Sequence, residues 1–221
     1  MNINRYIDHT LLKPTASELD IKKLCDEAIE HDFYAVCVNS SYVKLAKDFL
    51  FPNTSVSVCS VIGFPLGAMS TEAKIAELEQ AKLDGAEEFD MVINIGWLKS
   101  RKEDLVFKEI KKLKFAAGNM ILKVIIETCY LTDEEKIKAT EIAVEAGADF
   151  VKTSTGFGTG GATFKDIAIM RKAVKGNAKL KASGGIRNYE TAKKYIDAGV
   201  SRLGTSNGIA IINGTISQNN Y

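Results

Sequence analysis

The residue best suited to covalent chemistry in this sequence is Lys152, in the segment Phe-Val-Lys-Thr-Ser-Thr-Gly (150–156). The apolar residues before it predict a strand buried on both faces, where an ammonium group must either reach solvent or lose its charge. A neutral amine attacks carbonyl carbons and forms a Schiff base. Lys152 is therefore a candidate Schiff-base lysine, and the alternative is a strand-end lysine that extends into water.

Two further charged residues lie in apolar runs and could assist this amine. The two-residue period of a strand puts Lys179 and Lys181 on one face, and a positive charge at Lys181 beside Lys152 would favour the uncharged amine. Asp90 precedes Met-Val-Ile-Asn (91–94), so its carboxylate needs a partner, and it could move protons through a bound water during imine formation. The alternatives are a solvated pair of lysines and a structural ion pair at Asp90.

Three glycine-rich turns follow the last three apolar runs of the chain, and turns of this kind can expose backbone N–H groups to a phosphate. One such turn alone would be weak support, because glycine often serves only as a cap or a tight turn. An arginine there can pair with phosphate or simply be solvated. The candidate phosphate-binding residues are Gly156, Phe157, Gly184, Gly185, Ile186, Arg187, Gly204, Ser206 and Asn207.

Metal-binding residues are too few for a catalytic zinc site. The chain has only two histidines, His9 and His31, so a three-histidine zinc site cannot be built. We expect His31 to cap a helix end and His9 to make local hydrogen bonds. The four cysteines form no Cys-x-x-Cys pair, which predicts reduced thiols, and Cys37 is either a packed core thiol or a residue facing substrate. The sequence therefore predicts amine chemistry and no metal site.

Eight short apolar or β-branched runs alternate with amphipathic stretches and would position these residues. Helix start signals precede several stretches, with Ser17, Ser70 and Thr132 as candidate caps followed by acidic residues. A recurring junction, in which a glycine ends a helix and an apolar pair begins a strand, precedes Asp90, Lys152 and Gly204. The candidate strands are the region of Ile7, then 34–39, 56–64, 88–95, 121–128, 150–155, 180–183 and 202–205.

Eight strand-helix units in 221 residues predict a (β/α)8 TIM barrel with its site at the carboxyl ends of the strands. An open, doubly wound sheet is the alternative. It is disfavoured because Asp-His-Thr-Leu-Leu (8–12) follows the first strand in place of a Gly-x-Gly-x-x-Gly turn.

The composition predicts one globular domain over residues 1–221, with 46% hydrophobic and 26% charged residues and a polar tail (217–220) that looks flexible. The 29 basic and 28 acidic residues form no long block of one sign, which argues against nucleic acid or a membrane surface as partner. The first residues lack the apolar stretch of a signal peptide. We therefore expect a cytoplasmic protein that acts on a small molecule.

Taken together, four motifs resemble those of the deoxyribose-phosphate aldolase family. They are Tyr-Ile-Asp-His-Thr-Leu-Leu-Lys-Pro (6–14), Glu-Phe-Asp-Met-Val (88–92), Val-Lys-Thr-Ser-Thr-Gly-Phe (151–157) and Lys-Ala-Ser-Gly-Gly-Ile-Arg (181–187). The resemblance covers nearly the whole chain, and the last two motifs are specific in combination.

The resemblance implies reversible cleavage of 2-deoxy-D-ribose 5-phosphate to acetaldehyde and D-glyceraldehyde 3-phosphate, in deoxynucleoside breakdown, by a cofactor-free class I aldehyde-lyase. It assigns the Schiff base to Lys152, the neighbouring lysine to Lys181 and proton transfer to Asp90, and it implies a homodimer. Some relatives use a tyrosine in a mobile C-terminal tail. Tyr221 follows two asparagines here rather than glycine, so it is left out of the site.

Two rival functions share many of these features. Another lysine aldolase or a transaldolase-like barrel would use the same covalent chemistry on a different sugar phosphate. A non-catalytic barrel that binds sugar phosphates would use Lys152 and Lys181 only to neutralise the phosphate charge.

Overall fold

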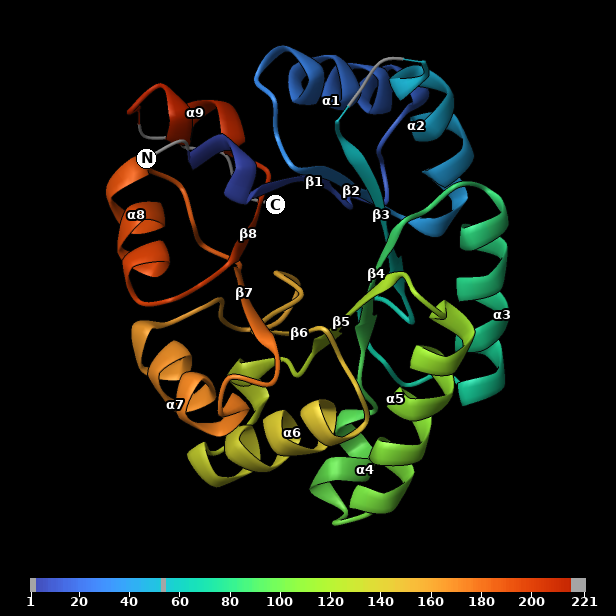
Figure 1. Cartoon of the computed structure of the whole chain (residues 1–221), viewed down its shortest axis with the longest axis vertical. Helices are drawn as coiled ribbons and strands as arrows, with labels where there is room; N and C mark the ends of the chain where they lie inside the picture. The colour runs from blue at the N-terminus through green and yellow to red at the C-terminus, as the bar shows by residue number, and fades with distance from the viewer. Residues whose placement is uncertain (1–2, 53–54, 216–221) are drawn as a thin grey trace.

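The chain folds into a closed barrel of eight parallel strands in sequential order, seen in a computed structural model that describes residues 3–52 and 55–215. Each strand pairs with the next, and the last pairs with the first (Figure 1). The strands are β1 (Ile7–Leu11), β2 (Ala35–Val38), β3 (Ser57–Ile62), β4 (Glu88–Val92), β5 (Ile121–Ile125), β6 (Phe150–Lys152), β7 (Lys179–Ser183) and β8 (Arg202–Thr205).

The helices form a ring around the barrel, with at least one between each pair of successive strands (Figure 1). Short 3-10 turns at Ile3–Tyr6, Ser40–Tyr42 and Thr128–Tyr130 accompany them. The α-helices are α1 (Glu18–Glu30), α2 (Val43–Leu50), α3 (Thr71–Leu83), α4 (Ile95–Lys99), α5 (Glu103–Ala117), α6 (Asp133–Glu145), α7 (Phe164–Val174), α8 (Tyr189–Asp197) and α9 (Gly208–Ile212).

The helix boundaries follow the predicted capping chemistry. Ser17, Ser70 and Thr132 are the N-caps of α1, α3 and α6, and each side chain accepts a hydrogen bond from the backbone N–H three residues later. This bond satisfies one of the donors that the first turn of a helix leaves unpaired. The predicted glycine stops are also present, because Gly85 and Gly147 adopt positive φ angles of 104° and 92° just after α3 and α6.

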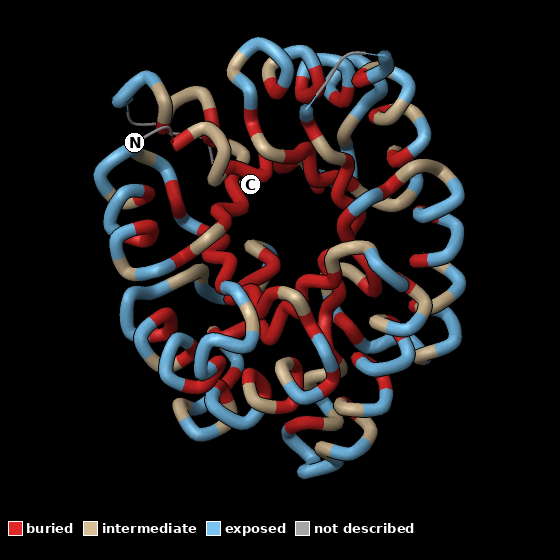
Figure 2. The backbone as a smooth tube through the Cα atoms, viewed as in Figure 1, coloured by how far each residue is buried: buried red, intermediate tan, exposed pale blue. Residues whose placement is uncertain are grey.

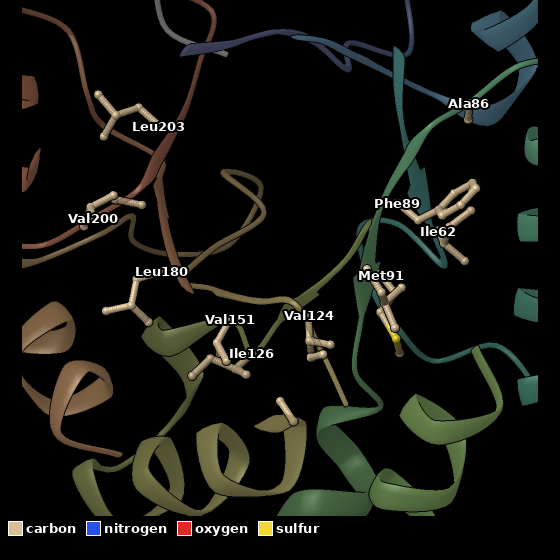
Figure 3. Packing of buried hydrophobic residues seen from close by; sticks show 14 of the residues in the cluster. Ile62, Ala86, Phe89, Met91, Val124, Ile126, Val151, Leu180, Val200 and Leu203 are labelled. Atoms are coloured by element: carbon tan, nitrogen blue, oxygen red, sulfur yellow. The ribbon is translucent and has the colours of Figure 1, made fainter. Parts of the chain in front are cut away.

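Alternate residues of each strand face opposite sides of the barrel wall. Phe89 and Met91 of β4, Val124 of β5 and Leu180 of β7 point outward toward the helices (Figure 3). Burial of these apolar side chains between sheet and helices is the main stabilising contribution to such a fold. The inner strands and the inward turns of the helices are accordingly buried, whereas the outer helix faces are exposed (Figure 2). The intervening residues, among them Asp90, point into the barrel.

Closure of the barrel excludes the open sheet that the sequence left as an alternative. Ile7, Asp8 and His9 of β1 are in register with residues 203, 204 and 205 of β8. Most strands are shorter than the apolar runs that predicted them. For example, β6 ends at Lys152, although the apolar run suggested a strand to Thr155.

No helix in the described ranges 3–52 and 55–215 is long and apolar enough to cross a bilayer. The predicted flexible tail and Tyr221 lie outside the described residues.

Candidate active site

Strand register brings Lys152, Lys181 and Asp90 together inside the barrel. Lys152 and Lys181 are register partners on the adjacent strands β6 and β7. Both ammonium nitrogens lie 2.7 Å from the same carboxylate oxygen, Oδ2 of Asp90 in β4. Lys152 is 2% exposed and the other two are fully buried. The alternative of a solvated strand mouth is therefore wrong for Lys152 and Lys181, whereas Lys179 is exposed.

The other oxygen of Asp90 is also held, by residues that sequence reasoning missed. Lys123 of β5 donates to Oδ1 at 2.8 Å, and the thiol of Cys59 donates to the same atom at 3.1 Å. Lys123 also pairs with Glu88 of β4 at 2.6 Å. Asp90 thus contacts three ammonium groups, so its carboxylate is fixed on both oxygens.

A second carboxylate, Asp8 of β1, extends the network around the barrel. Lys181 donates to Asp8, and Arg202 of β8 donates to the other oxygen of Asp8 at 2.7 Å. Arg202 also reaches Glu88 at 3.1 Å. The buried network therefore holds four basic side chains against three carboxylates: Lys123, Lys152, Lys181 and Arg202 against Asp8, Glu88 and Asp90.

The network fixes the protonation of its members. Burial alone would raise the pKa of Asp90, but the charges of Lys123, Lys152 and Lys181 outweigh it and hold that pKa well below its usual range. For Asp8 burial also acts to raise the pKa, but the charges of Arg202 and Lys181 outweigh it and lower that pKa to about 2. Burial would lower the pKa of Lys181, yet Asp8 and Asp90 hold it above its usual range. Asp90 is thus a carboxylate and Lys181 an ammonium at neutral pH.

The predicted phosphate residues lie in the loops after β6, β7 and β8, except Gly204, which is within β8. Gly161 of the loop after β6 approaches Gly184 so closely that a Cβ added at Gly184 would lie 2.8 Å from the Cα of Gly161. The hydroxyl of Thr205 donates to the carbonyl of Ile186 at 2.8 Å, which ties the end of β8 to the loop after β7. A Cβ added at Gly204 would lie 3.1 Å from Cε of Lys181. The carboxyl end of β8 therefore borders Lys181.

Two of the predicted phosphate-binding residues use their backbone N–H groups for hydrogen bonds within the protein. The backbone N–H of Phe157 donates to the hydroxyl of Thr155 at 3.0 Å, and that of Asn207 donates to Thr205 at 3.0 Å. Gly185 and Arg187 are exposed at the mouth of the barrel. The short helix α9 follows β8 and begins directly after Asn207.

The two histidines are away from the lysines. His31 is the C-cap of α1, and its backbone N–H donates to the carbonyl of Glu27, as expected of a helix end. His9 pairs with the carboxylate of Glu27 at 2.7 Å. His31 has the helix-end role that the sequence predicted, whereas the partner of His9 is 18 residues away in sequence and not a local group.

Cys37 is fully buried and lies with Cys59 and Asp90, their ligand atoms all within 4.8 Å of one another. In the described part of the chain this is the one group of three side chains spaced to hold a metal ion. Asp90 already accepts bonds from three ammonium groups, and their positive charge opposes a cation there. The group is better suited to packing than to metal binding.

The residues that sequence reasoning missed are marked in the sequence by the alternation of charged and apolar residues within the strands. Lys123, Glu88 and Arg202 occupy strand positions that alternate with outward-facing apolar residues. In a closed barrel such positions point to the axis. Charged residues there must find partners among themselves.

Comparison with known proteins agrees with this geometry. Residues 3–217 match the model of the family described as DeoC/LacD family aldolase. The chain is 58% identical over 214 residues to a deoxyribose-phosphate aldolase of Brevibacillus brevis, covering 97% of this chain and 96% of the relative. Identity to the enzyme of that name from Thermococcus kodakarensis is 59% over 216 residues, 96% of each chain.

Solved structures show the same likeness. The structure described as a unique tetrameric deoxyribose phosphate aldolase from Aeropyrum pernix is 32% identical, with a TM-score of 0.87 over 96% of this chain and 89% of the other. An aldolase designated QR15 is 46% identical, with a TM-score of 0.92 over 96% of this chain and 94% of the other. The chain belongs to the DeoC/LacD family of aldolases.

Proposed function

We propose that this chain is a deoxyribose-phosphate aldolase, which cleaves 2-deoxy-D-ribose 5-phosphate reversibly to acetaldehyde and D-glyceraldehyde 3-phosphate. The observation that carries the proposal is the contact of Lys152 and Lys181 with one oxygen of Asp90, beside three glycine-rich loops. Relatives with that name match almost the full chain.

Lys152 is the group in the network that forms the Schiff base. With every member charged, the network has one positive charge in excess. Arginine keeps its proton. Burial acts to lower the pKa values of Lys123 and Lys181, but the carboxylates around them outweigh burial and raise both values. Among the described residues Lys152 pairs with Asp90 alone and is slightly exposed, whereas Lys123 and Lys181 are fully buried. Its amine is therefore the one placed to attack a carbonyl carbon.

Cleavage then proceeds through an imine formed on Lys152. The amine of Lys152 adds to the aldehyde carbon of the open-chain sugar, and loss of water gives an iminium ion. The hydroxyl on carbon three gives up its proton, the bond between carbons two and three breaks, and its electron pair moves to the iminium to form an enamine. Protonation of the enamine and hydrolysis release acetaldehyde. Lys181 and Asp90, in contact with each other and with Lys152, are the groups that we assign to proton transfer through water at these steps.

The glycine-rich loops hold the phosphate of the substrate. Gly156, Gly184, Gly185 and Gly204 let the backbone approach the anion closely, and Ser206 and Arg187 supply polar contacts at the mouth. Binding at this end fixes the distance from the phosphate to the carbon attacked by Lys152, which lowers the entropy cost of reaction.

The chemistry needs no metal or organic cofactor, since the iminium ion is itself the electron sink. We place the enzyme in the cytoplasm, because its four cysteines are free thiols and its substrates are phosphorylated sugars. We infer a homodimer, as the family resemblance implies, which sedimentation at several concentrations tests.

The assay that tests the proposal measures glyceraldehyde 3-phosphate released from 2-deoxy-D-ribose 5-phosphate, with a chelator present. We expect turnover by the wild type and a loss of at least about a hundredfold in Lys152→Leu. Cleavage of other sugar phosphates but not of this one would identify a different lysine aldolase. Binding without any turnover would support the non-catalytic barrel.

A further inference from the structure

Glu127, which none of the steps above uses, lies just beyond the end of β5 in an unusual backbone conformation. Its φ and ψ angles are 52° and 70°, in the left-handed region, which a residue with a side chain adopts at a cost. The residue is only 2% exposed. Such strain persists where surrounding contacts impose it, often at functional sites.

The contacts of Glu127 are with the segment that follows the Schiff-base lysine. On either side of it, the N–H of Ile126 donates to the carbonyl of Lys152 at 3.1 Å and the N–H of Thr128 donates to that of Thr153 at 2.9 Å. The carboxylate continues this pairing past the end of β6. Both of its oxygens lie 3.2 Å from the backbone N of Thr155, whose hydroxyl also donates to the carboxylate.

Thr155 passes this constraint to the glycine turn. Its hydroxyl oxygen accepts the N–H of Phe157 at 3.0 Å, so the residues on both sides of Gly156 are tied to one another. Gly156 itself has a φ of 88°. The carboxylate also needs the space left at Gly158, where an added Cβ would lie 3.3 Å from Cδ of Glu127. The turn is thus shaped around a buried acid.

We propose that Glu127 is a positioning residue: by holding Thr155 it sets the Gly156 turn and thereby the grip on the substrate phosphate, while leaving the amine chemistry of Lys152 intact. This inference rests on the proposed function. It separates two contributions to the reaction, because the Glu127 carboxylate accepts hydrogen bonds from Thr155 and the Lys152 amine donates to Asp90, and only the attraction between the two charges connects Glu127 with Lys152.

The test compares Glu127→Gln with the matched variant Glu134→Gln, an exposed glutamate at the start of α6. Glutamine has nearly the same shape but only one acceptor oxygen, so the bonds from Thr155 cannot all be kept. For Glu127→Gln we expect KM for 2-deoxy-D-ribose 5-phosphate and the inhibition constant of inorganic phosphate to rise about tenfold or more. The borohydride-trapped adduct of acetaldehyde, which has no phosphate, should form as in wild type.

If Glu127→Gln weakened phosphate binding and acetaldehyde adduct formation equally, or changed neither, the inference would be overturned. A wild type that fails to cleave the sugar phosphate would instead overturn the proposed function. If Glu127→Gln does not fold, the comparison is made at Thr155. Thr155→Val should reproduce the phosphate defect, Thr155→Ser should keep wild-type values, and a Val variant with unchanged KM would contradict the inference.

Discussion

Lys123 shows how a member of a buried charge network can look ordinary in the sequence. Its neighbours Leu122 and Val124 make the segment read as a plain apolar strand. Only the closed barrel shows that the side chain reaches Asp90 and Glu88. The predicted trio of Lys152, Lys181 and Asp90 could be proposed from residue types, whereas their support depends on which strands become neighbours.

Replacing Lys123 by methionine should destabilise the protein strongly. The variant leaves Glu88 and Asp90 with one cation fewer in a buried site, and removal of one partner of a buried pair costs about 3–5 kcal/mol. The free energy of unfolding in urea measures the loss. The control is Lys22→Met, which breaks an exposed pair with Asp26 and should cost less than about 1 kcal/mol. Equal effects of the two variants would contradict the network as described.

Asp8 makes a prediction about stability at low pH. Its pKa is about 2 in the folded protein against an ordinary 3.8, so the unfolded state takes up the proton first. The stability that this carboxylate contributes, about 2 kcal/mol, is fully present above pH 4 and is lost as the pH falls through about 2. As the pH falls from 4 to 2, the unfolding free energies of wild type and Asp8→Asn should converge. Parallel curves would show that Asp8 is not responsible.

At the scale of elements, the strands and helices could largely be predicted from the sequence. Each of the eight apolar runs overlaps a strand. The predicted caps Ser17, Ser70 and Thr132 begin their helices, because capping is a local interaction. Strand ends were less predictable. Glu127, in the left-handed region, is hydrogen-bonded to Thr155, 28 positions away in sequence, and no local pattern indicates this contact.

The contact between the loops after β6 and β7 also makes a testable prediction. Gly184→Ala should raise KM for the sugar phosphate at least about tenfold, since the new Cβ would lie 2.8 Å from Gly161 and push the loops apart. Gly176→Ala is the control. It has a similar φ of 81° against 85°, but nothing lies within 4 Å of its added Cβ, so it should lose only about 1–2 kcal/mol of stability. Equal KM values in the two variants would refute a role for this close approach.

At the scale of the whole molecule, barrel closure assembles the site. Asp8 in β1 and Arg202 in β8 are 194 residues apart in sequence, yet Nη1 of Arg202 lies 2.7 Å from Oδ1 of Asp8 in the fold. The outward-facing apolar residues of the strands pack against the helices, whereas the charged strand residues that face inward are buried and pair with one another. The sequence predicted the barrel from its repeating units, but pairing across the interior required the register of all eight strands.

The central claim, that Lys152 forms the covalent intermediate, is tested most directly by trapping. Wild type and Lys152→Leu are incubated with acetaldehyde and borohydride, and adducts are located by intact mass and peptide mapping. The account predicts a single ethyl adduct, on Lys152, in the wild type and none in the variant. An adduct on Lys181 or Lys123, an undiminished adduct in Lys152→Leu, or no adduct in the wild type would contradict it.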